Sequence, residues 1–352
     1  MALARVTAEQ ALAGLDSFDT LIDARSESEY ALDHLPGALN WPTLDDAQRH
    51  AVGSEYKQVS AFDARKQGAV LAARNIARHI EREAMDKPRS WRPLVYCWRG
   101  GQRSGSFALV LEQIGFAVHL LDGGYRAYRR ALRAALDALP PRFEWRVLCA
   151  PTGSGKSRLL HTLAAQGAQV IDLEALAEHR GSVLGLVPGE EQPGQKLFES
   201  RLWDALRRLD PARPVFVESE SRKVGNLRVP ESLIEAMRAA RCVRLDMPLD
   251  ARVQLLLEDY RYFVDDATAF CERLDALRTL RGHAVIEAWQ ASARAGRMAE
   301  VVRALLVEHY DPVYLASMER NFARFGEAPP LLLADGSAAS LAAIAQRLQA
   351  AD

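Results

Sequence analysis

The sequence has few cysteines, no long apolar run and almost no net charge. The four cysteines lie far apart and form no C-x-x-C pair (Cys97, Cys149, Cys242 and Cys271), which argues against a zinc site and against a disulfide framework. No apolar run is long enough to span a bilayer, and the N-terminus lacks the apolar core of a signal peptide. We therefore expect a cytoplasmic protein with no membrane contact. Because the formal net charge is only −1, contact with a nucleic acid would require a local basic patch.

Two domains are expected from the length of the chain and from a break in its pattern. The chain has 352 residues, of which 49% are apolar, enough for two separate cores. Pro140 and Pro141 interrupt a helical pattern, and a strand pattern begins near Trp145. We assign residues 1–138 to the first domain and residues 143–352 to the second.

Short apolar strands alternate with helix-period segments on both sides of this break. The expected strands are TLID (20–23), PLVYC (93–97), VHLLDGG (118–124), WRVLC (145–149), QVIDL (169–173), PVFVES (214–219) and CVRLDM (242–247). This alternation predicts an α/β protein whose two parallel sheets are covered by helices. From Leu249 to about Phe325 the pattern is mostly helical and rich in arginine, which predicts a helical C-terminal part on the second sheet.

One cysteine, Cys97, follows a predicted strand in the stretch LVYCWRGGQRSGSF (94–107). Gly100 and Gly101 allow backbone N–H groups to turn inward as an anion-binding nest, and the next helix directs its positive end toward them. Arg99 and Arg103 add full positive charges. All three effects favour the thiolate, which is the nucleophilic form. A buried, unreactive cysteine is the common alternative, but these surroundings favour a reactive one.

A second glycine-rich turn lies in the stretch RVLCAPTGSGKSRLL (146–160), between a strand and a helix. Five residues match the end of a P-loop: Gly153, Ser154, Gly155, Lys156 and Ser157. In such a loop backbone N–H groups cradle phosphates, the lysine reaches across them, and the serine offers a ligand for Mg²⁺. Ala150 replaces the usual first glycine, which is tolerable if its φ is negative. This departure puts nucleotide hydrolysis in doubt more than phosphate binding.

Charged residues after the next strands are candidates for the same pocket. The stretch VFVESES (215–221) ends in Glu218 and Glu220. One of them could hold Mg²⁺ through water, or both could be solvated carboxylates at a strand end. The stretch IDLEALAEHRGS (171–182) supplies Asp172, Glu174, His179 and Arg180. These residues could line the pocket, although a histidine at a helix end can equally lie on the surface.

Two groups of basic residues are candidates for nucleic-acid contact. The first recurs at helical spacing and comprises Arg126, Arg129, Arg130 and Arg133. No acidic residue lies between Tyr125 and Leu136, so we expect one basic face, with Tyr125 and Tyr128 placed to stack a base. The second group is Arg222, Lys223 and Arg228. The alternative for both groups is a solvated helix or loop face that binds no nucleic acid, which is where runs of charged residues usually lie.

The N-terminal half resembles rhodanese domains. The stretch DARSESEYALDHLPGALN (23–40) is similar to their first motif, and LDGGYRAYR (121–129) and the cysteine loop fit the same fold. The resemblance implies a cysteine that carries a chalcogen atom. Single-domain rhodaneses often have C-x4-R, whereas this loop has C-x5-R and therefore has room for a tetrahedral oxyanion, as in the cysteine phosphatases that resemble rhodaneses. The loop itself leaves both activities open.

The combination of motifs resembles the tRNA 2-selenouridine synthase family. A rhodanese-like domain with YCWRGGQRS (96–104) precedes a P-loop domain with GSGKS (153–157) and ESESRKVGNLRVPESL (218–233). The resemblance implies replacement of the sulfur of wobble-position 2-thiouridine in tRNA by selenium from selenophosphate. It also implies geranylation of the 2-thiouridine with geranyl diphosphate, and Cys97 as the residue that carries selenium. An enzyme that supplies selenophosphate is therefore a candidate partner.

Two other functions remain open at this stage. One is a cysteine-dependent phosphatase or sulfurtransferase joined to a kinase-like domain. The other is a non-enzymatic P-loop scaffold that recruits RNA. The sequence does not decide whether the P-loop takes a nucleotide or the diphosphate of the geranyl donor.

Overall fold

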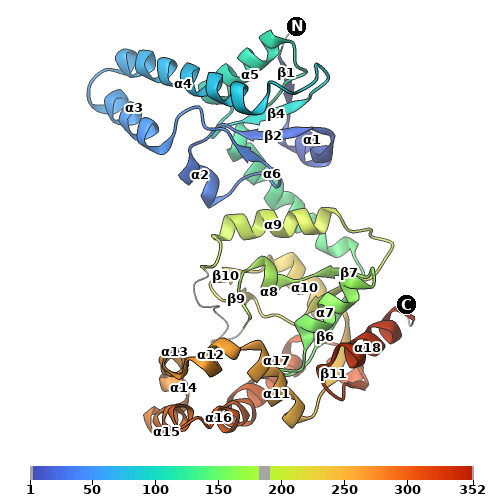
Figure 1. Cartoon of the computed structure of the whole chain (residues 1–352). Coiled ribbons are helices and arrows are strands. Elements are labelled where there is room, and N and C mark those ends of the chain that lie inside the picture. Colours follow the sequence, from blue (N-terminus) through green and yellow to red (C-terminus); the bar gives the residue numbers. More distant parts are fainter. Residues whose placement is uncertain (1–2, 182–190, 351–352) are drawn as a thin grey trace. The chain divides into compact units, whose positions relative to one another are not determined.

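The computed structural model describes residues 3–181 and 191–350, and the chain divides into two compact units (Figure 1). The first unit comprises residues 1–136 and 193–204, and the second comprises residues 137–192 and 205–352. The sequence places all of residues 143–352 in one domain. The segment 193–204, which forms most of helix α9 (Gln195–Arg207), instead makes its contacts within the first unit.

A five-stranded parallel sheet forms the centre of the first unit, in the order β1-β5-β4-β2-β3. Its strands are β1 (Ala4–Val6), β2 (Thr20–Asp23), β3 (Leu39–Asn40), β4 (Pro93–Tyr96) and β5 (His119–Leu121). The helices besides α9 are α1 (Ala8–Ala13), α2 (Glu27–Leu32), α3 (Asp46–Gln58), α4 (Ala61–Glu83), α5 (Gln102–Ile114) and α6 (Gly124–Ala138). Residues of α4 and α5 bury one face of the sheet, where Ile76 and Phe107 pack against Val95.

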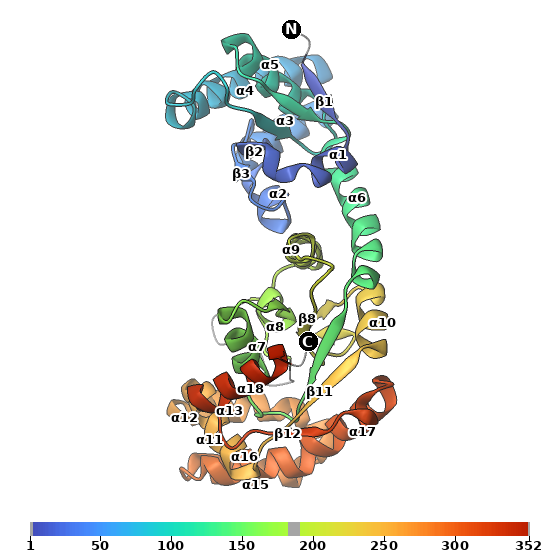
Figure 2. The same cartoon turned by 90° about the vertical axis from the view of Figure 1, so that its right-hand side faces the viewer.

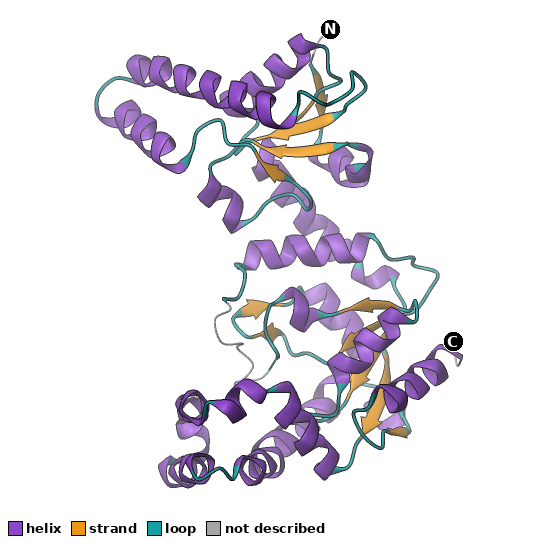
Figure 3. Ribbon diagram, viewed as in Figure 1, coloured by secondary structure: helices purple, strands orange, loops and turns teal. Residues whose placement is uncertain are grey.

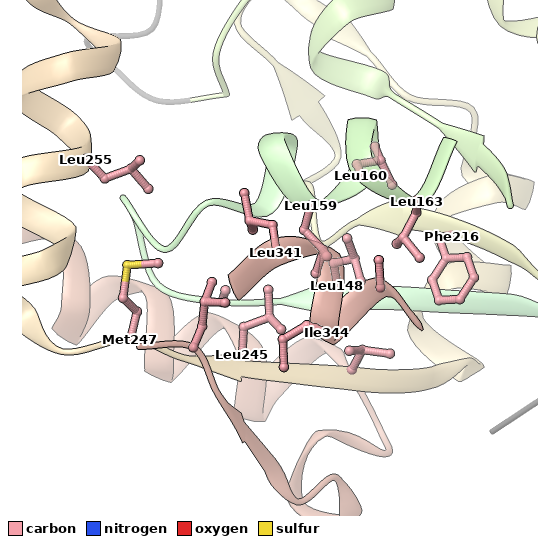
Figure 4. Close-up of a cluster of buried hydrophobic side chains, with 14 residues drawn as sticks. Leu148, Leu159, Leu160, Leu163, Phe216, Leu245, Met247, Leu255, Leu341 and Ile344 are labelled. Atoms are coloured by element: carbon pink, nitrogen blue, oxygen red, sulfur yellow. The ribbon is translucent and has the colours of Figure 1, made fainter. Parts of the chain in front are cut away.

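The second unit contains another five-stranded parallel sheet, in the order β12-β11-β6-β8-β7. Its strands are β6 (Trp145–Cys149), β7 (Gln169–Ile171), β8 (Val215–Glu218), β11 (Arg241–Asp246) and β12 (Pro330–Leu332), and β9 (Lys223–Val224) and β10 (Leu227–Arg228) form a separate antiparallel pair. Figure 4 shows how α7 (Lys156–Ala165) and α18 (Ala338–Ala350) bury leucines against this sheet.

The C-terminal part of the second unit is mainly helical (Figure 3). It has its own apolar core. The unit also contains α8 (Leu173–Leu176) and α10 (Glu231–Ala239). The helical C-terminal part consists of α11 (Leu249–Asp259), α12 (Arg261–Asp265), α13 (Ala267–Leu274), α14 (Arg278–Arg281), α15 (His283–Arg294), α16 (Met298–Ala304), the π-helical segment η4 (Leu305–Tyr310) and α17 (Asp311–Asn321) (Figure 2). The α/β class, both parallel sheets and the helical C-terminal part are as predicted. Among the described residues, no helix is both long and apolar enough to cross a bilayer.

Candidate active site

Cys97 directly follows β4 and is separated from helix α5 by the loop of residues 98–101, as the strand-to-helix pattern predicts. Its side chain is buried, with 3% of the residue exposed. The Ser104 hydroxyl, on the first turn of α5, donates a hydrogen bond to Cys97 Sγ over 3.1 Å. A hydroxyl donor stabilises a thiolate, so this contact supports a nucleophilic sulfur. Sequence reasoning missed Ser104, although its place directly after Arg103 puts it on the same helix turn.

The backbone between the cysteine and the helix forms an open anion-binding loop. Within the described residues, the N–H groups from Arg99 to Arg103 donate to no protein acceptor. Gly100 has φ +68, which turns the loop back on itself, and α5 has no side-chain cap at Gly101. Unpaired amides at a helix N-terminus bind anions. The expected cradle of Gly100 and Gly101 is therefore present beside the thiol.

The first turn of α6 fixes the shape of this loop. The Tyr125 N–H donates to the Cys97 carbonyl over 2.8 Å, and the Arg126 N–H donates to the Trp98 carbonyl over 3.2 Å. Gly124 has φ +57, and a Cβ there would lie 2.2 Å from the Cys97 oxygen. Only glycine permits so close an approach. The GlyGlyTyr stretch of the rhodanese-like motif thus holds the nucleophile loop.

Buried polar groups from the other rhodanese-like motif support α6 in turn. Arg25 forms an ion pair of 2.6 Å with Asp23, and both side chains are almost fully buried. The Arg25 guanidinium lies 4.0 Å from the ring centroid of Tyr125 and donates to the Asp33 carbonyl over 2.6 Å. The Tyr125 hydroxyl donates to the Asp33 carboxylate over 2.7 Å. These residues hold Tyr125, whose backbone N–H in turn donates to the Cys97 carbonyl.

The two arginines of the loop differ in their surroundings. Arg99 is exposed. Arg103 forms an ion pair of 2.7 Å with Glu29 on α2, and Arg49 contacts the same carboxylate over 3.1 Å. Burial opposes ionisation of Glu29, but the Arg103 and Arg49 charges outweigh it and keep the pKa of Glu29 below its usual value. Glu29 therefore neutralises part of the charge that the sequence assigns to the cradle.

The arginine stripe on α6 is not one basic face, which corrects the prediction for Arg129. Arg126, Arg130 and Arg133 are exposed, but Arg129 is buried at 8% exposure. Arg129 pairs with Glu199 of α9 and lies 3.4 Å from Asp33. Asp33 and Glu199 are distant from Arg129 in the sequence. The lack of acidic residues within α6 therefore did not mean that Arg129 is unpaired. Tyr125 and Tyr128 are also buried and are not placed to stack a base.

The predicted P-loop connects β6 to α7 in the second unit. Gly153 and Gly155 have φ values of +78 and +73, and helix α7 begins at Lys156 without a side-chain cap. The Lys156 ammonium donates to the Ala150 carbonyl over 2.9 Å, across the loop. Ala150 is not among the described residues with positive φ, so the alanine fits this position. The arrangement leaves the amide-lined end of α7 available to phosphate groups.

Three glutamates gather at this loop, of which Glu218 is buried and Glu174 and Glu220 are half-buried. The Ser157 hydroxyl donates to Glu174 over 2.9 Å, and the Glu174 N–H donates to Glu218 over 2.8 Å. Glu218 is 2% exposed, and its Oε2 atom has no hydrogen-bond partner within the described part of the chain. Burial and the neighbouring carboxylates raise the pKa of Glu218, and they raise that of Glu220 to about 7. The solvated alternative is therefore wrong for Glu218.

The remaining residues of the predicted pocket have mainly structural partners. Asp172 caps α8 by accepting from the Ala175 N–H over 2.7 Å. His179 is buried, and burial lowers its pKa; it accepts from the Gly181 N–H over 3.1 Å. Arg180 donates to the Asp259 carbonyl over 2.9 Å and lies over the Tyr260 ring at 4.8 Å. Asp172, His179 and Arg180 thus make structural contacts, whereas the Glu174 carboxylate accepts a hydrogen bond from the P-loop serine.

Arg252 of α11 holds the P-loop from the helical part, and sequence reasoning missed it. It is 5% exposed and donates to the Thr152 carbonyl over 2.7 and 2.9 Å. Its guanidinium also pairs with Asp311 over 2.6 Å. A lone arginine in an arginine-rich helical region carries no local signal of this role.

The second basic group lies on the β9–β10 pair. Arg222, Lys223 and Arg228 are exposed, and Arg222 forms an ion pair of 2.7 Å with Glu231.

In the described ranges, no three carboxylate, imidazole or thiol side chains are arranged to hold a metal ion by themselves. A cation at the P-loop would therefore need ligands from the phosphates and water as well as Ser157.

Comparisons with known proteins match both halves of the chain. A model of the tRNA 2-selenouridine synthase AAA domain matches residues 143–281, and a rhodanese-like domain model matches residues 7–131. A protein of Alcanivorax borkumensis named tRNA 2-selenouridine synthase is 32% identical over 335 residues, which cover 86% of this chain and 90% of that protein. The chain belongs to the tRNA 2-selenouridine synthase family.

Other relatives match in part. A tRNA 2-selenouridine synthase of Nitrosomonas europaea is 37% identical over 249 residues, which cover 68% of this chain and 63% of that protein. A solved N-terminal domain of a putative ATP/GTP binding protein from Clostridium difficile 630 is 31% identical and covers 36% of this chain and 97% of that chain, with a TM-score of 0.31.

Proposed function

We propose that this chain converts wobble-position 2-thiouridine in tRNA to 2-selenouridine, with geranyl diphosphate and selenophosphate as co-substrates. The observation that carries the proposal is the buried Cys97 thiol beside five open backbone N–H groups. A loop of this kind suits a tetrahedral oxyanion such as the phosphoryl group of selenophosphate. The choice of a tRNA uridine as substrate is based on the names of the relatives.

The geranyl step is assigned to the P-loop. The sulfur of 2-thiouridine attacks the first carbon of the geranyl chain, a C–S bond forms, the C–O bond breaks, and diphosphate leaves with the electron pair. The base releases its N3 proton to solvent, and a C2=N3 double bond replaces the C2=S bond. Amides at the start of α7 and the Lys156 ammonium would stabilise the charge on the departing diphosphate. The product has a thioether sulfur on C2 of the base, which leaves more readily than the original sulfur.

The selenium step is assigned to Cys97. The thiolate attacks phosphorus, an S–P bond forms, and the P–Se bond breaks. Water then releases phosphate and restores the thiol. Selenide adds to C2 of the geranylated base, and geranyl thiol leaves. The step is a substitution at each centre, with no change in oxidation state.

This route differs from a selenium atom carried on Cys97, the role that the family resemblance implies. Selenophosphate and a thiolate both hold their chalcogen in the fully reduced state. Joining sulfur to selenium would remove two electrons and would need an oxidant. Transfer of the phosphoryl group needs none, and the C-x5-R loop has room for it.

We assign a Mg²⁺ ion to the P-loop, because Mg²⁺ commonly binds together with a diphosphate. Ser157 would be its protein ligand, and Glu174 and Glu218 would hold its water molecules, since the Glu218 Oε2 atom has no partner within residues 3–181 and 191–350. Its chemical contribution would be to neutralise the leaving diphosphate.

Exposed arginines of α6 are the proposed tRNA contacts in the first unit. Arg126, Arg130 and Arg133 remain after the correction for Arg129. Each lost phosphate contact should lower the slope of log affinity against log salt by roughly one unit. The double variant Arg126→Ala and Arg130→Ala should therefore bind tRNA more weakly and with a flatter salt dependence. A wild-type slope would move the RNA contacts elsewhere, with Arg222, Lys223 and Arg228 as the next set to test.

The test of the selenium step is a labelling experiment with selenophosphate that carries ³²P. Wild-type protein, quenched by acid, should hold phosphorus label on Cys97, and Cys97→Ser should hold none. Selenium on Cys97 without phosphorus would contradict the phosphoryl route. Release of phosphate from simple phosphomonoesters, with no change in tRNA nucleosides, would instead favour the phosphatase alternative.

A further inference from the structure

An apolar pocket lies in the helical part of the second unit, and the P-loop forms part of its wall. Thr152 of the loop lines it, together with side chains of α11, α12, α13, α16 and η4, among them Leu256, Phe270, Met298 and Val302. Among the residues that the structure describes, no charged side chain lines this space. The space free of protein atoms is about 530 Å³, including the part that opens to solvent. The pocket is thus an apolar extension of the predicted phosphate site.

The pocket wall and the P-loop are packed against each other directly. A Cβ on Gly153 would lie 2.8 Å from the Leu256 side chain, so the loop backbone touches a residue that lines the pocket. Arg252, one turn earlier on α11, holds the Thr152 carbonyl over 2.7 Å. A ligand whose head lies on the loop would therefore meet apolar side chains within one residue of the phosphate-binding amides.

The π-helical segment η4 supports a ligand-binding role for the pocket. Leu305, Leu306 and Tyr310 of this segment line it. π-Helical turns are uncommon and occur often at functional sites, because they alter the direction of side chains within a helix. At the other side, Val264 is 40% exposed and lines the pocket, so the space reaches the surface.

The chemistry of the lining selects the class of ligand. A nucleoside buried here would leave most of its polar ring atoms without partners, which is costly, because the only side-chain hydroxyls in the described lining are those of Thr152, Tyr260 and Tyr310. A hydrocarbon chain has no such groups and gains free energy from burial in proportion to its area. We infer that this pocket binds the isoprenoid chain of an allylic diphosphate while the diphosphate lies on the P-loop. The inference rests on the proposed geranyl step and names the part of the protein that selects the chain.

The test compares geranyl diphosphate with inorganic diphosphate by calorimetry on the full-length protein. Wild type should bind geranyl diphosphate at least about tenfold more tightly, because only this ligand buries a chain. Val302→Trp fills the pocket and should remove most of that advantage, while affinity for inorganic diphosphate stays unchanged. Val307→Trp is the matched control, since Val307 is 50% exposed on η4 and does not line the pocket.

The outcomes separate this inference from the proposed function. Equal affinity of wild type for the two ligands, or full geranyl affinity in Val302→Trp, would overturn the pocket assignment and leave the phosphate role of the P-loop intact. No binding of either ligand to wild type would overturn both. Retained affinity for inorganic diphosphate verifies that Val302→Trp is folded. If that variant does not fold, Val264→Trp at the exposed rim makes the same comparison.

Discussion

Two loops of this protein share one backbone plan and differ in the charges around them. Each follows a buried parallel strand and opens an uncapped helix, α5 after the cysteine loop and α7 after the P-loop. Beside the first loop lies a thiol that accepts a hydrogen bond from Ser104. Beside the second lies Lys156 with buried glutamates that include Glu218.

Under the proposed function, the same anion-binding plan serves two reactions. At the cysteine loop the protein supplies its own nucleophile, and nearby positive charge is partly balanced by Glu29. At the P-loop the protein supplies no nucleophile but a lysine and carboxylates that suit a cation and a departing diphosphate. We therefore expect substitutions at the two loops to affect different properties of the protein.

The largest expected effect concerns the support of the cysteine loop. Arg129→Ala leaves the buried carboxylate of Asp33 and that of Glu199 without their cation, so it should lower the free energy of unfolding by roughly 3–5 kcal/mol. Arg130→Ala removes an exposed neighbour and should change it by about 0.5 kcal/mol or less. Urea unfolding of both variants measures the difference. Equal stability would mean that the ion pairs of Arg129 do not hold the loop.

Lys156→Ala should mainly affect ligand binding at the other loop. The variant loses a hydrogen bond between charged groups, worth about 1.5–3 kcal/mol, so affinity for inorganic diphosphate should fall roughly 10- to 100-fold. Selenophosphate labelling of Cys97 should stay at the wild-type level. Calorimetry and labelling on the same preparation check both halves, and loss of labelling would contradict the division between the loops.

The carboxylates at the P-loop predict a pH dependence of stability. Burial and the Glu174 charge raise the pKa of Glu220 from 4.5 to about 7, so the folded state favours the protonated form. The stability from this group is present below pH 4.5 and is lost as pH rises through 7. Glu220→Gln keeps the neutral form and should be more stable than wild type by on the order of 1–2 kcal/mol at pH 8, and equal to it near pH 4.5. An identical gain at both pH values would show that ionisation is not the cause.

The smallest effect is expected at the serine beside the thiol. Ser104→Ala removes the donor to Cys97 Sγ and should slow alkylation of Cys97 by iodoacetamide at pH 7 by about five- to tenfold. Ser106→Ala is a control on the same helix, because the Ser106 hydroxyl donates to the Gln102 carbonyl instead. Equal rates in the two variants would mean that the Ser104 contact does not activate the sulfur.

Local features of the sequence predicted both loops, because each loop is encoded by a continuous run of residues between a strand and a helix. Features made by distant residues were not predicted. Arg129 pairs with Glu199, which lies 70 residues away in the sequence. Arg252 donates a hydrogen bond to the Thr152 carbonyl, which lies 100 residues away. The burial of Glu218 likewise depends on packing, because a glutamate at a strand end looks the same in the sequence whether it is buried or solvated.

The central claim is that the two loops act in succession on one tRNA base. Mass analysis of tRNA nucleosides tests it most directly, in cells that contain only Cys97→Ala or only Lys156→Ala protein. The account predicts that Cys97→Ala cells lack 2-selenouridine but contain geranylated 2-thiouridine. It predicts that Lys156→Ala cells have greatly reduced amounts of both. Normal 2-selenouridine in the Cys97→Ala cells, or loss of the geranylated nucleoside there, would contradict it.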